Sequence, residues 1–160
     1  MSDKSRRTAW PVAVALDAGL VMGAAAGATD WPQFRGPDRE GTVDGAGLLR
    51  TWGDGQPVVV WRRAIGSGYS AVTVVGDRLY TMDADATREH VLCLDAATGA
   101  TLWKVDAGDF VQAELGDGGP RSTPTVVDGT VYTTTSQAVV LALDADDGER
   151  IWQKDLTEFG

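Results

Sequence analysis

Short runs of β-branched and apolar residues alternate with turns that contain Gly and Asp through the second half of the chain. Runs of this kind, bounded by turn residues, predict strands. We expect four strands in a first group and four in a second, so the predicted fold class is all-β. Their expected positions are 71–75, 78–82, 90–94 and 101–105, then 123–127, 130–134, 139–143 and 150–154.

The second group of strands repeats the first in sequence as well as in pattern. An aspartate, a glycine and a tryptophan in the stretch 94–103 return at one constant spacing in 143–152. A period of about 50 residues with four antiparallel strands in each unit is typical of a β-propeller blade. We therefore expect two blades, at about 69–108 and 120–157.

Each repeated residue has a physical role in a turn that leads into an outer strand. The glycines supply a positive φ, and the aspartates, helped by Thr98, accept hydrogen bonds from turn amides. The tryptophans can pack on a neighbouring blade and donate the indole N–H to its backbone. We therefore predict a structural set that docks tryptophans between blades. It comprises Asp95, Thr98, Gly99, Trp103, Asp144, Gly148 and Trp152.

One extra strand is expected before the first blade, within a region predicted to hold the partial propeller, 56–160. The β-branched run 57–62 lies between turn residues, and its Trp61 stands where the closing strand of a further blade would carry one. Propellers close with about 4 to 8 blades. The predicted architecture is therefore an incomplete propeller, and the chain is expected to be an N-terminal fragment or a truncated gene product.

Residues 1–28 predict a secretory signal peptide. A basic segment, an apolar stretch and a run of small residues follow one another there, with cleavage expected after Ala28 or Ala26. Asp17 interrupts the apolar stretch, which leaves a disordered or amphipathic tail as the alternative. A pair of arginines leaves the twin-arginine route open beside the general one. We expect an exported protein, periplasmic or associated with the cell envelope, with no membrane span after signal removal.

Residues 29–55 predict an extended arm and loop. Two prolines, a glycine and two aromatics within 30–37 exclude a helix or a central strand. We expect Trp31 and Phe34 to hold the arm on the domain by aromatic burial, with ligand stacking by Trp31 as the alternative.

The composition of the chain limits the classes of partner that it is expected to bind. The chain of 160 residues is 43% hydrophobic and 23% charged, with a formal net charge of −9. Such an acidic surface repels nucleic acid and anionic lipid, so neither is an expected partner. Cys93, the single cysteine, lies in an apolar run and is interpreted as a small buried hydrophobe rather than a reactive thiol.

The repeated stretches resemble the PQQ-type blade motif, which is found in quinoprotein alcohol dehydrogenases and in BamB-type outer-membrane assembly factors. The matching residues are Asp95, Thr98, Gly99 and Trp103 in the first copy and Asp144, Gly148 and Trp152 in the second. The first hairpins 74–80 and 126–132 match the blade as well, and 31–37 looks like the N-terminal lead of exported PQQ-like repeat proteins.

The resemblance implies a propeller, and in the dehydrogenases it also implies a cofactor site. There the quinone lies between a tryptophan and a disulfide of adjacent cysteines, and calcium is held by Glu, Asn and Asp side chains. This chain has one cysteine and no asparagine. We therefore predict no catalytic, cofactor-binding or metal-binding residue here, with PQQ and calcium expected only under the dehydrogenase alternative.

Other candidate sites are few. His90 is the single histidine, and Asp83 and Asp85 form a carboxylate pair without the further ligands of a calcium loop. The glycine-rich 116–121 lacks the ending of a P-loop. Arg121 is the face residue that we single out for a functional test, against the alternative of a loop arginine paired with a local carboxylate.

Three functions remain open. The first is an exported, non-catalytic scaffold, similar to BamB, that binds a protein or polymer on the propeller face. The second is the N-terminal part of a PQQ-dependent dehydrogenase whose active site lies outside this chain. The third is a sensor propeller fused to another module. Whether the protein is an enzyme stays open, with the scaffold preferred.

Overall fold

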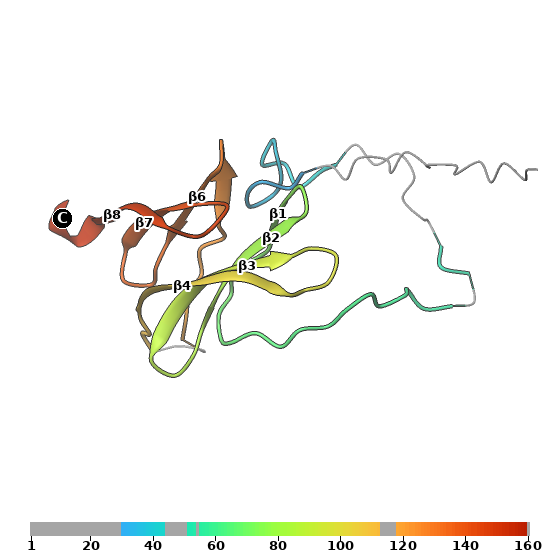
Figure 1. Ribbon diagram of the computed structural model, residues 1–160, viewed down its shortest axis with the longest axis horizontal. Helices are drawn as coiled ribbons and strands as arrows, with labels where there is room; N and C mark the ends of the chain where they lie inside the picture. The colour runs from blue at the N-terminus through green and yellow to red at the C-terminus, as the bar shows by residue number, and fades with distance from the viewer. Residues whose placement is uncertain (1–29, 44–50, 54, 113–117, 160) are drawn as a thin grey trace, which may run out of the picture.

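The computed structural model describes residues 30–43, 51–53, 55–112 and 118–159. The predicted signal peptide, residues 1–28, lies outside them. The described residues form two antiparallel four-stranded sheets and contain no α-helix, as Figure 1 shows. None of the helical structure described is long and apolar enough to cross a membrane.

Both sheets have the simple up-and-down order of a propeller blade. The first contains β1 (Thr73–Val75), β2 (Arg78–Ala84), β3 (Arg88–Asp95) and β4 (Thr101–Asp109). The second contains β5 (Thr125–Val127), β6 (Thr130–Thr134), β7 (Val139–Asp144) and β8 (Arg150–Asp155), followed by the 3-10 turn η1 (Leu156–Phe159). The all-β fold of two blades is confirmed.

The hydrophobic core lies between the two blades. Tyr80, Val91 and Trp103 of the first sheet meet Val131 and Leu141 of the second, all of them buried. Because side chains alternate between the faces of a strand, every second residue of β2, β3 and β4 points at the second blade.

The expected strand at 57–62 is wrong. Residues 56–66 have no regular secondary structure, and Val58 and Val60 are 89% and 80% exposed. A β-branched run needs a partner strand to pair its backbone and pack its side chains, and no described strand lies beside these two valines. The segment instead crosses the outer face of the first blade and first pairs its backbone at Ser67, which bridges Ala84.

The arm is fixed to the inner strands of both blades. Trp31 forms a two-way backbone bridge with Val74 of β1, and Val126 of β5 donates its N–H to the Pro32 carbonyl at 2.8 Å. The Trp31 ring packs beneath Gly36, where an added Cβ would lie 2.8 Å from the ring. The expected burial of Phe34 is wrong: this residue is 62% exposed. The arm is held instead by its backbone bonds to β1 and β5 and by the Asp30 carboxylate, which accepts the Gly76 N–H at 2.8 Å.

Candidate binding face

The two blades present different structures at their two ends. The β1–β2 hairpin and the β3–β4 turn lie at one end of the first sheet, together with the arm (Figure 1). The β2–β3 loop and the connector that follows β4 lie at the other end. We call this second end, with the matching β6–β7 turn and the segments that lead into β1 and β5, the loop face.

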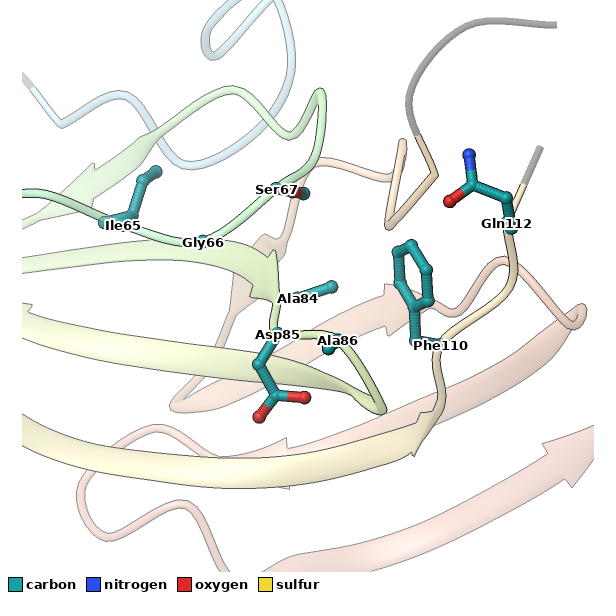
Figure 2. Close-up of a pocket in the computed structure, with 8 residues that line it drawn as sticks. All are labelled: Ile65, Gly66, Ser67, Ala84, Asp85, Ala86, Phe110 and Gln112. Carbon is teal, nitrogen blue, oxygen red and sulfur yellow. The ribbon is translucent and has the colours of Figure 1, made fainter.

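The first cavity of the loop face has a volume of about 680 Å³. Its walls are the segment before β1, the β2–β3 loop and the connector after β4. Figure 2 shows the Phe110 ring standing between the β2–β3 loop and Gln112, with the Asp85 carboxylate turned away from the ring. The cavity is therefore bounded by backbone, an aromatic ring and an amide. Its lining residues are Ile65, Gly66, Ser67, Ala84, Asp85, Ala86, Phe110 and Gln112.

The Asp85 carboxylate stabilises its own loop. One of its oxygens accepts hydrogen bonds from the Thr87 and Arg88 N–H groups, each at 2.8 Å, and from the Thr87 hydroxyl at 2.9 Å. These bonds favour the ionised form and lower the pKa of Asp85 to about 2. Asp85 is thus a charged loop-forming residue at neutral pH.

His90 lies between two carboxylates. Its Nδ1 is 3.2 Å from Asp83 and its Nε2 is 3.6 Å from Asp85. Asp83 is also 3.6 Å from the Lys104 ammonium and accepts the Gly66 N–H at 2.9 Å. These contacts link β2, β3 and β4 to the segment that crosses the first blade. His90 and Asp83 therefore have a structural role there. In the described part of the chain, no three His, Cys, Asp or Glu residues are placed to hold a metal ion.

The second cavity of the loop face has a volume of about 420 Å³ and lies at the second blade. Arg121 lines it together with the hydroxyl residues Ser122, Thr134, Thr135 and Ser136, and with Val111 and Gly119. The Arg121 guanidinium lies 4.6 Å from the centre of the Tyr69 ring, a cation–π contact. Among the described residues no carboxylate lies within ion-pair distance of Arg121. Arg121 therefore brings a positively charged side chain to the lining of this cavity.

A buried glutamate joins the blades behind this face. Glu89 is fully buried and accepts the Ser136 N–H at 3.0 Å through Oε2, while its Oε1 has no hydrogen-bond partner among the described residues. The sequence carried no signal for this contact, because Glu89 stands between the polar residues Arg88 and His90 at the start of β3.

The predicted tryptophan-docking residues lie at the opposite end. Trp103 donates its indole N–H to the Ala145 carbonyl at 3.1 Å, and its ring covers Gly148, where an added Cβ would be 2.9 Å from it. Asp95 accepts the N–H and hydroxyl of Thr98, at 2.7 and 2.6 Å, and these bonds lower the pKa of Asp95. These residues shape turns and contacts between blades.

The same contact occurs once more, at a residue that the sequence did not place in the set. Trp61 donates its indole N–H to the Ala96 carbonyl at 3.0 Å and covers Gly99, where an added Cβ would meet its ring at 2.7 Å. Trp152 makes no such contact among the described residues and is 45% exposed, against 8% for Trp103. The structure therefore brings Trp103 to Gly148 and leaves Trp152 on the open side of the second blade.

Comparison with known proteins places these features in a family. Residues 13–158 match the family described as outer membrane protein assembly factor BamB. A quinohemoprotein alcohol dehydrogenase, ADH-IIG of Pseudomonas putida, is 56% identical over 39 residues, which are 24% of this chain and 5% of that enzyme.

Solved structures were compared with the fold as well. The quinohemoprotein alcohol dehydrogenase of Comamonas testosteroni aligns over 86% of this chain and 21% of its own, with a TM-score of 0.61 and 20% identity, and it shares the fold. BamB from Moraxella catarrhalis aligns over 56% of this chain and 23% of its own, with a TM-score of 0.38 and 21% identity. This chain thus spans about a quarter or less of the length of these relatives.

Proposed function

Since the chain belongs to the family of PQQ-like propeller repeat proteins described by the assembly factor BamB, we propose that it is an exported, non-catalytic scaffold. It binds a protein or polymer partner on the loop face. The observation that carries this proposal is the pair of Tyr69 and Arg121. The Tyr69 side chain is 52% exposed, and Arg121 lies against its ring beside the second cavity.

The chemistry of this pair suits recognition. Tyrosine and arginine are the residue types that concentrate binding energy in protein interfaces, because they offer large apolar area together with hydrogen-bond donors. The hydroxyl groups along the second cavity add donors and acceptors without charge. A partner that presents carbonyl or carboxylate oxygens fits this lining.

Site-specific photo-crosslinking tests the loop face. A crosslinking residue replaces Ser136, an exposed residue of the second cavity, in one variant and Asp128, in the β5–β6 hairpin at the opposite end, in the control. We expect one discrete partner to be captured from the cell envelope at position 136 and not at 128. In a pull-down with that identified partner, Tyr69→Ala should weaken capture at least fivefold. Equal capture at both positions would count against the proposal.

The second candidate function is a part of a quinone-dependent dehydrogenase, which the 39-residue match to an alcohol dehydrogenase favours. The residues of this chain do not fit the quinone site that the family resemblance describes. Cys93 is fully buried in the core between the blades, and the sequence has no second cysteine to pair with it. Titration of the full-length protein that carries this chain with PQQ and calcium, followed by a dye-linked alcohol oxidation assay, separates the candidates. Oxidation would overturn the scaffold proposal, and absence of quinone binding would overturn the dehydrogenase alternative.

A further inference from the structure

Another cavity lies on the arm, away from the loop face. Its volume is about 430 Å³, and it is lined by Gln33, Phe34, Arg35, Arg39 and Thr125. The first four belong to the arm and Thr125 begins β5. Figure 1 shows the arm beside the tip of β1, at the end of the sheets opposite the β2–β3 loop.

Two arginines give this cavity a positive lining in an acidic protein. The net charge of the chain is −9, yet no carboxylate lines the cavity among the described residues. Asp38 and Glu40 are exposed on the same loop, and neither forms an ion pair with Arg35 or Arg39 within the described part of the chain. The charge of the two guanidinium groups is therefore not neutralised by a contacting carboxylate.

The arginine side chains are held in place by neutral partners. Arg35 donates through one Nη to the Glu40 carbonyl at 3.2 Å, and Arg39 donates through Nε to the Gln33 side-chain oxygen at 2.9 Å. Among the described residues the two terminal nitrogens of Arg39 have no hydrogen-bond partner, and they form a planar fork of donors. Such a fork matches the two oxygens of a carboxylate.

The backbone at the two arginines is strained in a way that glycine would avoid. Arg35 and Arg39 have φ values of 65° and 59°, in the left-handed region that side chains oppose. Gly36 and Gly41 of the same loop also have positive φ values, of 80° and 73°, which glycine adopts without this strain. The arm therefore keeps two arginines at positions where they destabilise it.

An exposed ring completes the lining. Phe34 is 62% exposed although it stands beside the charged pair. The phenyl ring can contact an apolar group while the two guanidinium groups bind a carboxylate. A ligand that carries both groups side by side therefore fits this lining.

We propose that this arm site binds a carboxylate carried next to an apolar group, the chemistry of the C-terminus of a polypeptide that ends in an apolar residue. The carboxylate lies against the Arg39 fork and Arg35, and the terminal side chain lies against Phe34. The site is independent of the partner proposed for the loop face.

Isothermal titration of the purified protein with a tetrapeptide ending in leucine tests the site. The free-acid peptide should bind saturably, and the same peptide as its C-terminal amide should bind at least tenfold more weakly. Acetate tests for a carboxylate alone and inorganic phosphate for another anion, and both should be weaker than the free acid. Equal binding of acid and amide, or tighter binding of phosphate, would overturn the proposal.

Substituted variants show which residues bind the peptide, and their melting temperatures distinguish a loss of binding from a loss of folding. Arg35→Gly and Arg39→Gly should each weaken binding of the free-acid peptide at least tenfold. The melting temperature should stay level or rise, because glycine adopts a positive φ without strain. Phe34→Ala should weaken binding of the same peptide about threefold to tenfold. Arg39→Lys should also lose affinity for the peptide, because lysine keeps the charge but lacks the planar fork of donors. Arg62→Ala, at an exposed arginine of the segment before β1 that lines none of the three cavities, is the matched control and should bind normally. Absence of saturable binding by the native protein, or binding that Arg35→Gly and Arg39→Gly leave intact, would overturn the assignment.

Discussion

At the scale of single residues, the contact between Trp103 and the turn that ends at Gly148 joins the two blades. The indole ring lies against the glycine, its N–H is bonded to the Ala145 carbonyl, and the ring centre is 5.9 Å from that of Tyr80. Each of these interactions needs the others, because the ring reaches the carbonyl only where the glycine leaves space for it.

The repeat supplies a matched test of this contact. Trp103→Ala should lower the free energy of unfolding by about 3–5 kcal/mol, the usual cost of removing a buried aromatic side chain. Trp152→Ala changes the equivalent residue of the second blade, which is 45% exposed, and should cost less than half as much. Urea denaturation followed by far-ultraviolet circular dichroism gives both values. Equal losses in the two variants would contradict the docking role of Trp103.

Substituting two glycines with alanine distinguishes the cost of backbone strain from the cost of steric contact with a neighbouring side chain. Gly129 and Gly148 have φ values of 75° and 79°, so alanine at either position is expected to cost about 1–2 kcal/mol for the left-handed backbone. An added Cβ at Gly148 meets Trp103 and Val105 atoms within 2.9 Å, whereas at Gly129 nothing lies within 4 Å. Gly148→Ala should therefore lower the melting temperature more than Gly129→Ala does. Equal shifts would show that the Trp103 ring moves aside without cost.

At the scale of elements, the two blades differ most in the hairpin between their second and third strands. β2 and β3 have 7 and 8 residues, against 5 and 6 in β6 and β7. The additional length carries Asp83 to the segment that crosses the first blade, where it accepts the Gly66 N–H, and it places His90 between Asp83 and Asp85. The additional residues of this hairpin are thus mostly extended strand.

The loop of this hairpin predicts a pH dependence. The pKa of Asp85 is lowered to about 2 in the folded protein, against about 3.9 in an unfolded chain. A lowered pKa contributes stability above pH 4 that is lost as the pH falls toward 2. Asp85→Asn should therefore reduce the fall in the urea midpoint between pH 5 and pH 2.5. A fall as steep as that of the native protein would contradict this role of the carboxylate.

At the scale of the whole molecule, the fold is two blades and a segment held against the outer face of the first. Trp61 and Arg63 fix that segment on the β3–β4 turn, through bonds to the carbonyls of Ala96 and Gly99. The side of the second blade that faces away from the first leaves Tyr132 37% exposed, where the equivalent Tyr80 is 1% exposed. The molecule therefore has one face covered by its own chain and one face open.

Export gives a prediction for the whole chain. We expect cleavage after Ala28, or after Ala26, when the protein is produced in a Gram-negative host with its own N-terminus, since the order of basic, apolar and small residues is that of a signal peptide. Intact-mass measurement of periplasmic material should then give a chain that begins near Thr29. Recovery of the uncleaved chain in the cytoplasm would contradict the signal prediction.

The two blades could be predicted from the local sequence pattern. Their strands pair with the next strand along the chain, and their turns need particular residues. The period-two runs, the turn glycines and the repeated tryptophans are all features of the amino-acid sequence itself. The strand expected at 57–62 failed because pairing depends on a partner strand, which a local pattern does not record.

Only the tertiary structure decided where the candidate sites lie. Residues far apart in sequence meet there: Tyr69 with Arg121, Glu89 with Ser136, and the arm with Thr125 of β5. The left-handed backbone at Arg35 and Arg39 is likewise a property of the folded arm. The class of fold could be predicted from the sequence, because it follows from local periodicity. The sites depend on long-range contacts and backbone angles, which packing of the blades sets.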